Sequence, residues 1–308
     1  MTPGTIIGRR YRLTERIGKG GMAEVWAAVE DGTGASVVVK TPRSSAMARS
    51  DLLKMFEREA ALLSRIQSEY VARFHGYFKE AGRPFIVCER LVGETLGDRL
   101  KRARVLTLAD LGPIVDQVLV ALCDAHAAGV LHRDLSPDNI FLARTPRGEI
   151  AKLIDFGVGK LQDGEPLTPA DATIGSLPYM APEQWLDPRL VDARADLYAL
   201  GTIVFRSLTG TLPFPEKNAI RLLTLKRDFD APTLSEVTHA PYPSAVAGMV
   251  ARALARNRED RFPTAASMLE AWRGVFAQSG WTAPEITMAG EDGGDTTATM
   301  TRAPRKPR

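Results

Sequence analysis

The chain up to about residue 90 alternates short runs of β-branched and aromatic residues with turns, a pattern that predicts β-strands. The turns include DGTG and EAGR, and the runs between the turns are YRLTERIG, EVWAAVED, ASVVVKT, YVARFHGYFKE and PFIVCERL. One segment, from about residue 49 to residue 66, differs because its apolar residues recur every three or four positions, which is typical of an amphipathic helix. These apolar residues are Leu52, Leu53, Phe56, Ala60, Leu63 and Ile66. The pattern therefore predicts a small antiparallel sheet with one helix.

The pattern changes to helical periodicity from about residue 96. A long periodic segment, LADLGPIVDQVLVALCDAHAAG, ends at Gly129, and glycine commonly follows the last turn of a helix. Further helices are expected to begin near Asp192, Glu216, Ser244 and Pro263. After about residue 278 the composition changes to Gly, Thr, Pro and charge, which is typical of disorder. We therefore expect an α+β chain with an N-terminal extension over residues 1–10, a folded domain over 11–276 and a disordered tail over 277–308.

Composition and charge narrow the class of protein. The 308 residues are 44% hydrophobic and 25% charged, as in ordinary globular proteins, and the net charge of +3 is too small and too evenly spread to favour nucleic acid as a partner. Cys88 and Cys123 lie in apolar stretches, which favours reduced thiols in a cytoplasmic protein. The N-terminus lacks the apolar core of a signal peptide. The longest apolar run, LYALGTIVF, is shorter than the roughly 18 residues of a membrane span, so we expect no such span.

The segment IGKGGMAEVW carries the first candidate chemistry, because Gly18 and Gly20 lie where one predicted strand turns into the next. Glycine lets backbone amides approach a phosphate without a side chain in the way. Taken alone, ordinary turn glycines of a hairpin are the simpler interpretation. A Rossmann site is excluded, because EVWAAVE predicts a strand where that motif needs a helix.

Lys40 ends the apolar strand VVVK, and a lysine that points inward from a strand end needs an anionic partner. A surface lysine is the alternative. Glu59 lies on the apolar face of the only helix expected in this region, so its carboxylate also needs a partner, and Lys40 is the nearest obvious cation. Glu57 is the competing carboxylate, but it lies further from the apolar stripe.

The segment HRDLSPDN places Asp134 and Asn139 on one short loop between a helix and a strand. A carboxylate and an amide at this spacing suit a general base beside a metal-binding oxygen. Downstream, LIDFGVG places Asp155 at the end of another apolar strand, where it suits a Mg²⁺ ligand. Each carboxylate also has a simpler interpretation, because Asp134 could cap a turn and Asp155 could merely end a strand.

Taken in order, these motifs resemble the eukaryotic-type protein kinase superfamily. The chain contains GKGGMAEV, VVVK, a helix glutamate in REA, HRDLSPDN, DFG, APE, DLYALG and a late arginine in EDRF, over roughly residues 11 to 276. The GGM loop and YMAPEQ look more like the bacterial Ser/Thr protein kinases of this superfamily. The resemblance implies a bilobal fold, with a sheet-rich N-lobe over residues 11–90 and a mainly helical C-lobe over 91–276.

The resemblance also implies a role for each motif. ATP would bind between the lobes, with Lys40 on its phosphates and paired with Glu59. Asp134 would accept or orient the proton of the substrate hydroxyl, while Asn139 and Asp155 would hold Mg²⁺. Cys88 would lie at the back of the adenine pocket. The residues implied in ATP binding are Ile17, Gly18, Lys19, Gly20, Gly21, Val25, Val38, Lys40, Glu89 and Leu91.

Regulation and partners follow from the same resemblance. Arg133, next to Asp134, implies control by a phosphate on the activation segment, for which Thr173 is favoured over Thr168 and Ser176. Glu183 would pair with Arg261, and Asp196 would support the loop that carries Asp134. The partners implied are protein substrates, a second copy of the chain in a homodimer, and a phosphothreonine-reading protein for the tail threonines. Those threonines are Thr296, Thr297, Thr299 and Thr301.

Three departures from the superfamily pattern keep other functions open. Ala23 stands where a third glycine is usual, Ser136 replaces a lysine that commonly reaches the γ-phosphate, and GSLPYMAPE differs from the usual GTPxYMAPE. An active Ser/Thr kinase is our leading hypothesis because Lys40, Glu59, Asp134, Asn139 and Asp155 are all retained. A pseudokinase scaffold is the alternative that Ala23 and Ser136 favour. A small-molecule phosphotransferase is a third, but YMAPEQ argues against it, because such enzymes generally lack this platform for peptide substrates.

Overall fold

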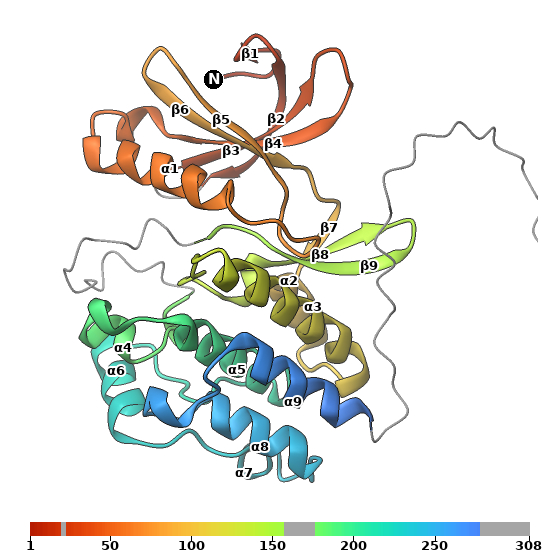
Figure 1. The fold of residues 1–308 in the computed structure, drawn as a ribbon, viewed down its shortest axis with the longest axis vertical. Coiled ribbons are helices and arrows are strands. Elements are labelled where there is room, and N and C mark those ends of the chain that lie inside the picture. The colour runs from red at the N-terminus through yellow and green to blue at the C-terminus, as the bar shows by residue number, and fades with distance from the viewer. Residues whose placement is uncertain (20–22, 157–175, 278–308) are drawn as a thin grey trace, which may run out of the picture.

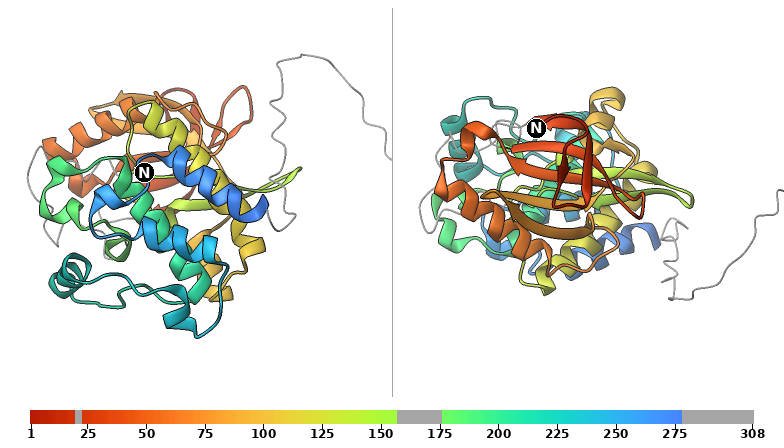
Figure 2. Two further views of the ribbon diagram at one scale, coloured as in Figure 1. Left: turned by 60° about the horizontal axis from the view of Figure 1, so that its bottom comes forward. Right: turned by 90° about the horizontal axis from the view of Figure 1, so that it is seen from above.

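The computed structural model describes residues 1–19, 23–156 and 176–277, and the chain forms two lobes (Figure 1). The first lobe is a sheet flanked by one helix, and the second is mainly helical, so the predicted α+β fold class is confirmed. The predicted disordered tail over residues 277–308 lies outside the described residues except for Ala277, which ends a helix. Seen from above, the sheet and its helix lie over the helices of the larger lobe (Figure 2, right).

The sheet of the N-lobe is antiparallel throughout, with strand order β1-β2-β3-β4-β6-β5. Its strands are β1 (Ile6–Ile7), β2 (Tyr11–Lys19), β3 (Ala23–Glu30), β4 (Ser36–Pro42), β5 (Phe74–Glu80) and β6 (Arg83–Glu89). The predicted extension over residues 1–10 thus contributes a strand of two residues, too short to give a pattern, and Ile7 is buried against the sheet. The strand expected from Tyr70 begins only at Phe74.

The two faces of this sheet have different partners. Helix α1 (Ser50–Leu63) packs on one face and buries Leu52 and Phe56 there. The other face has its own apolar cluster, which includes Trp26 and Phe85. Because successive residues of a strand point to opposite faces, β4, β5 and β6 direct alternate side chains toward the face that carries α1 and toward the opposite face.

The C-lobe is built from helices and a small three-stranded sheet. The helices are α2 (Leu96–Ala103), α3 (Leu108–Ala127), α4 (Glu183–Leu186), α5 (Ala193–Thr209), α6 (Ala219–Asp228), α7 (Leu234–Thr238), α8 (Ser244–Ala253) and α9 (Ala265–Ala277). The sheet contains β7 (Gly93–Thr95), β8 (Ile140–Thr145) and β9 (Gly148–Leu153). Short 3-10 turns are η1 (Ser44–Ala46), η2 (Pro137–Asn139), η4 (Leu177–Tyr179), η5 (Pro188–Leu190) and η6 (Arg258–Asp260).

Local sequence signals explain where the main helices begin and end. A capping box of Thr107 and Asp110 starts α3, and Gly129, with φ of 71°, follows its end as predicted. Asp192 caps the N-terminus of α5 by accepting a hydrogen bond from the backbone N–H of Arg194. Helix α5 contains the run LYALGTIVF, which is buried in the lobe. Among the described residues, no helix combines the length and the apolar character needed to cross a membrane.

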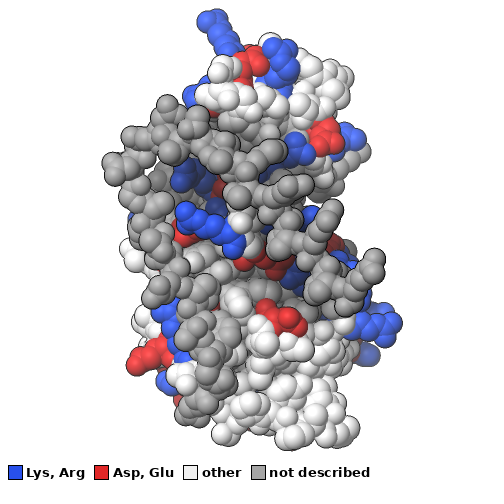
Figure 3. Space-filling model, turned by 90° about the vertical axis from the view of Figure 1, so that its right-hand side faces the viewer, with Lys and Arg blue, Asp and Glu red and all other residues white. Residues whose placement is uncertain are grey.

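Charged side chains of both signs cover the surface. On the face drawn in Figure 3, blue Lys and Arg side chains lie among red Asp and Glu side chains. Many of these charges form exposed ion pairs, such as Arg227 with Asp228 and Arg256 with Asp230. Exposed pairs of this kind contribute little to stability.

Candidate active site

A cavity of about 190 Å³ lies between the two lobes. Its walls are mainly apolar, and charged side chains from four separate segments of the chain gather in it. The residues that line it are Ile17, Val25, Val38, Lys40, Glu59, Leu63, Val71, Ala72, Ile86, Cys88, Glu89, Leu91, Phe141, Leu153, Ile154, Asp155 and Phe156. A cavity of this character suits a ligand that has a flat apolar part and an anionic part.

Strand register explains why these side chains face the cavity. In the β4–β6 pair, Val38 lies opposite Cys88 and Lys40 lies opposite Ile86. All four side chains line the cavity, while the alternate residues of both strands pack into the second apolar cluster. The alternation that makes VVVK a strand therefore also directs Lys40 inward.

Lys40 is the centre of a three-residue charge cluster. Its Nζ donates to Oε1 of Glu59 at 2.7 Å and to Oδ1 of Asp155 at 3.1 Å. Burial alone would lower the pKa of Lys40, but the carboxylates of Asp155 and Glu59 outweigh it and raise this pKa, so the ammonium keeps its proton. The predicted pair of Lys40 with Glu59 is confirmed, and the competing Glu57 instead pairs with Lys79 at the surface.

The loop between α3 and β8 brings Asp134 and Asn139 close to this cluster. The side-chain amide of Asn139 donates to the backbone oxygen of Asp134 at 2.8 Å, which closes the loop on itself. The backbone oxygen of Asn139 accepts a hydrogen bond from Ile154 N at 3.0 Å, directly before Asp155. Asn139 therefore links the loop that carries Asp134 to the end of the strand that carries Asp155.

Asp196 anchors the start of the same loop from the buried helix α5. Its carboxylate accepts hydrogen bonds from the backbone N–H of His132 at 2.9 Å and of Arg133 at 2.8 Å, and it contacts Nε2 of His126 at 2.8 Å. Burial alone would raise the pKa of Asp196, but these contacts lower it, so the carboxylate stays ionised. The supporting contact predicted for Asp196 is confirmed.

Arg133 is held in a backbone conformation that non-glycine residues rarely adopt, with φ of 60°. Within the described part of the chain, its guanidinium forms no ion pair with a carboxylate. The predicted partners for this group are phosphates on the activation segment. Of the three candidate acceptors of this phosphate, Thr168 and Thr173 lie outside the described residues, while Ser176 is described and buried. Gly20 and Gly21 of the predicted ATP-binding loop also lie outside the described residues.

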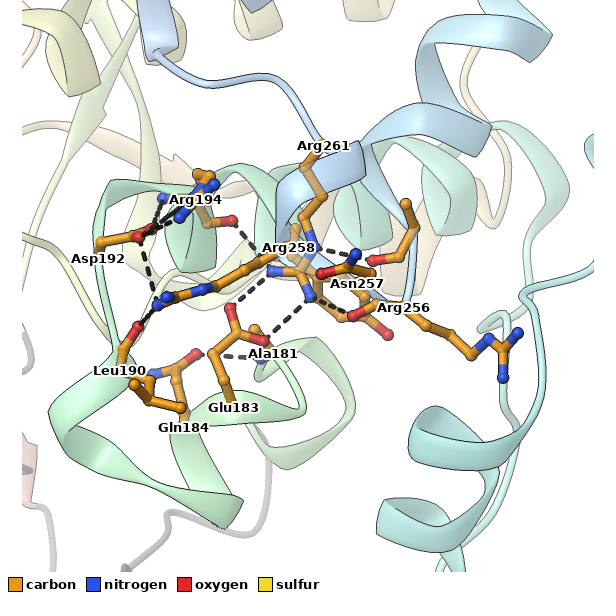
Figure 4. A network of polar contacts seen from close by, with 12 residues as sticks. Ala181, Glu183, Gln184, Leu190, Asp192, Arg194, Arg256, Asn257, Arg258 and Arg261 are labelled. Atoms are coloured by element: carbon orange, nitrogen blue, oxygen red, sulfur yellow. Dashed lines mark hydrogen bonds and ion pairs between the residues drawn. The ribbon is translucent and has the colours of Figure 1, made fainter.

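Glu183 and Arg261 form a buried ion pair beneath the segment that precedes α4 (Figure 4). The two carboxylate oxygens accept from Nη1 and Nη2 of Arg261 at 2.6 and 3.0 Å, so the pair is bidentate, as predicted in outline from sequence. The neighbouring Gln184 accepts a hydrogen bond from Ala181 N and donates one to the backbone oxygen of Arg133 at 2.9 Å. Arg133 precedes Asp134, so this segment is tied directly to the loop of the site.

The sequence identified part of the cavity wall and missed the rest. Lys40 and five more of the predicted ATP-binding residues line it, namely Ile17, Val25, Val38, Glu89 and Leu91, and Cys88 lies there as expected. Gly18 is not a lining residue, and a Cβ there would make a tight contact of 3.3 Å with Cβ of Val25. Val71, Phe141 and Leu153 were not predicted, although their apolar strand runs were a usable signal.

Comparison with known proteins points to one family. The family model described as protein kinase domain matches residues 11–272. The serine/threonine-protein kinase Pkn1 of Myxococcus xanthus is 36% identical over 277 residues, which cover 87% of this chain and 38% of Pkn1. The serine/threonine-protein kinase PknA of Mycobacterium tuberculosis is 34% identical over 227 residues, covering 71% of this chain and 52% of PknA.

Solved structures agree with this result. The crystal structure of the Mycobacterium tuberculosis PknI kinase domain aligns with a TM-score of 0.68 and 25% sequence identity, covering 89% of this chain and 98% of that one. This chain thus matches an isolated kinase domain nearly end to end, whereas it spans only 38% of Pkn1 and 52% of PknA.

Proposed function

Because the chain belongs to the protein kinase domain family, as its motifs predicted, we propose that it is an ATP-dependent Ser/Thr protein kinase. It transfers the γ-phosphoryl group of ATP to hydroxyl groups of proteins, and one of its own activation-segment hydroxyls is among the first acceptors. The observation that carries the proposal is the joint placement of a mainly apolar cavity, the Lys40 charge cluster and the loop with Asp134.

ATP and Mg²⁺ fit the residues present. The apolar walls suit adenine, and the raised pKa of Lys40 keeps a positive charge where the phosphates would lie. Asn139 and Asp155 offer an amide and a carboxylate oxygen, the ligand types that Mg²⁺ prefers, and Mg²⁺ usually completes its shell with water and phosphate oxygens. When bound, Mg²⁺ neutralises charge that develops on the phosphates.

The protein's own groups then have separate tasks. Glu59 orients Lys40 by accepting its 2.7 Å hydrogen bond, and Lys40 holds the phosphates. Asp134 orients the acceptor hydroxyl and receives its proton, since it lies on the loop that Asn139 and Asp196 fix in place. The free thiols Cys88 and Cys123 and the use of ATP support a cytoplasmic location.

The test is phosphate transfer followed by identification of the modified residues. Purified protein is incubated with radiolabelled ATP and Mg²⁺, and label is compared between the wild type, Asp134→Asn, and the matched control Asp138→Asn on the same loop. We expect Asp134→Asn to lose at least about 100-fold in rate, since proton transfer by a positioned group contributes about 10²–10⁴. Mass spectrometry should locate phosphate on Ser or Thr, with Thr173 favoured.

Two outcomes would reject the proposal. Equal label on wild type and Asp134→Asn would show that Asp134 takes no part in any transfer. No label on any of the three proteins, combined with thermal stabilisation by ATP and Mg²⁺, would favour a nucleotide-binding scaffold, the alternative that Ser136 suggests.

A further inference from the structure

Lys226 of α6 is a buried cation that the proposed phosphoryl transfer does not use. Only 3% of the residue is exposed. Its Nζ donates hydrogen bonds to the backbone oxygens of Met180 at 2.6 Å and Pro178 at 2.7 Å, and it lies 3.5 Å from that of Leu177. One ammonium group therefore holds three carbonyls of the segment from residue 177 to residue 180.

The surroundings of this ammonium show that hydrogen bonding to the segment is its main compensation for burial. Among the described residues no carboxylate forms an ion pair with it, and Glu183 is engaged bidentately by Arg261. The ring of Tyr198 lies 5.2 Å from Nζ and also carries the guanidinium of Arg261 at 4.7 Å. Burying a charge is costly unless it is well hydrogen-bonded. The apolar cluster beside it would accept a methionine without that cost.

The segment from residue 177 to residue 180 is linked to the loop that carries Asp134 through the next residue, Ala181. Ala181, directly after Met180, donates its N–H to Gln184 at 3.0 Å (Figure 4). Gln184 in turn donates to the backbone oxygen of Arg133 at 2.9 Å. Arg133 precedes Asp134. The segment from residue 177 to 181 is thus fixed from α6 on one side and to the loop of Asp134 on the other.

We propose that Lys226 is a positioning residue for the protein acceptor: it fixes the buried segment from residue 177 to 181, which through Gln184 sets the position of the loop where Asp134 meets the acceptor hydroxyl. The inference rests on the proposed kinase function, because it concerns the second substrate of that reaction. Lys226 makes no contact with the cavity between the lobes. Its loss should therefore weaken use of the protein acceptor and leave use of ATP unchanged.

The decisive experiment separates the two substrates. Steady-state kinetics with myelin basic protein as acceptor are measured for the wild type, Lys226→Met and the matched control Lys217→Met, whose lysine is exposed on the segment before α6. We expect Lys226→Met to raise the KM for the acceptor at least fivefold while the KM for ATP stays within twofold. An unchanged acceptor KM, or an equal rise in both constants, would overturn the inference.

Hydrogen exchange gives a readout that does not depend on activity. The amides of Leu177, Tyr179, Met180 and Ala181 should exchange at least tenfold faster in Lys226→Met than in Lys217→Met, and equal exchange would overturn the inference. Lys226→Gln, which keeps a side-chain N–H donor, should change both measurements in the same direction but less, and it replaces the methionine variant if that protein does not fold. A wild type that transfers no phosphate would instead reject the proposed function, and the exchange result would still decide the role of Lys226.

Discussion

Replacing Glu183 with glutamine should destabilise the C-lobe strongly, although the change removes no more than one charge. The side chain of Arg261 is completely buried and that of Glu183 is 11% exposed, so their ion pair is almost shielded from water. Glutamine has nearly the same shape as glutamate and can still accept one hydrogen bond from Arg261. What it cannot supply is the negative charge that balances the guanidinium.

The expected cost follows from this imbalance. Removing one partner of a buried ion pair typically costs about 3–5 kcal/mol, because the other charge stays buried without compensation. Arg261 keeps four weaker partners, namely the backbone oxygens of Ala255, Arg256 and Arg194 and the ring of Tyr198. We therefore expect the low end, about 3 kcal/mol. For a domain of this size that is a fall in Tm of roughly 6–12 °C, at about 2–4 °C per kcal/mol.

Thermal and urea denaturation of the variant would measure this loss. The matched control is Glu259→Gln, which removes the same charge from an exposed pair with Arg194, where the Glu259 side chain is 61% exposed. Exposed pairs contribute about 0–1 kcal/mol, so the control should melt within about 4 °C of the wild type. If Glu183→Gln and Glu259→Gln melted at the same temperature, the argument from burial would be refuted.

Two further changes test other contacts. Gly93→Ala should lower the free energy of unfolding by about 1–3 kcal/mol, because φ at Gly93 is 156° and a Cβ there would lie 2.0 Å from the backbone oxygen of Leu142; an unchanged melting temperature would contradict this. Burial raises the pKa of Cys88 to about 12, so iodoacetamide at pH 8 should alkylate Cys88 more slowly than Cys123, and ATP should slow the alkylation of Cys88 further. Mass spectrometry measures both rates, and equal rates for the two cysteines would argue against the placement of Cys88 in the cavity wall.

Local patterns in the sequence predicted those features that depend on neighbouring residues. The strand run VVVK left open whether Lys40 points inward or outward, and the helix glutamate and the order of the motifs favoured the inward position. Helical periodicity separated Glu59 from Glu57. The ends of α3 and α5 followed from caps that the chain carries within a few residues. The two-residue strand β1 and the three-residue strand β7 are too short to give a pattern.

Features that depend on distant packing could not be predicted in the same way. The cavity wall combines Val71 with Leu153, which pair through an isolated bridge between segments far apart in the chain. Lys226 is a sharper case, because EKNAIRLLTLKRD is a polar stretch in which a lysine is expected at the surface. One signal was present: Lys226 lies four residues after Leu222, the other buried residue of α6, and so shares its face.

Lys226 and Asp196 point to a common design in the C-lobe. Asp196 offers a buried carboxylate to the backbone N–H groups of His132 and Arg133, and Lys226 offers a buried ammonium to the backbone oxygens of Pro178 and Met180. Each charge comes from a helix and binds main-chain groups of a loop, so these contacts do not depend on the side chains of the bonded residues. In the catalytic loop they act together with the side-chain amide of Asn139, and Asp134 is proposed to serve chemistry there. We therefore predict that substitutions at Lys226 and Asp196 change activity by moving the loops that these residues hold. A substitution at Asp134 should change activity while both loops keep their positions.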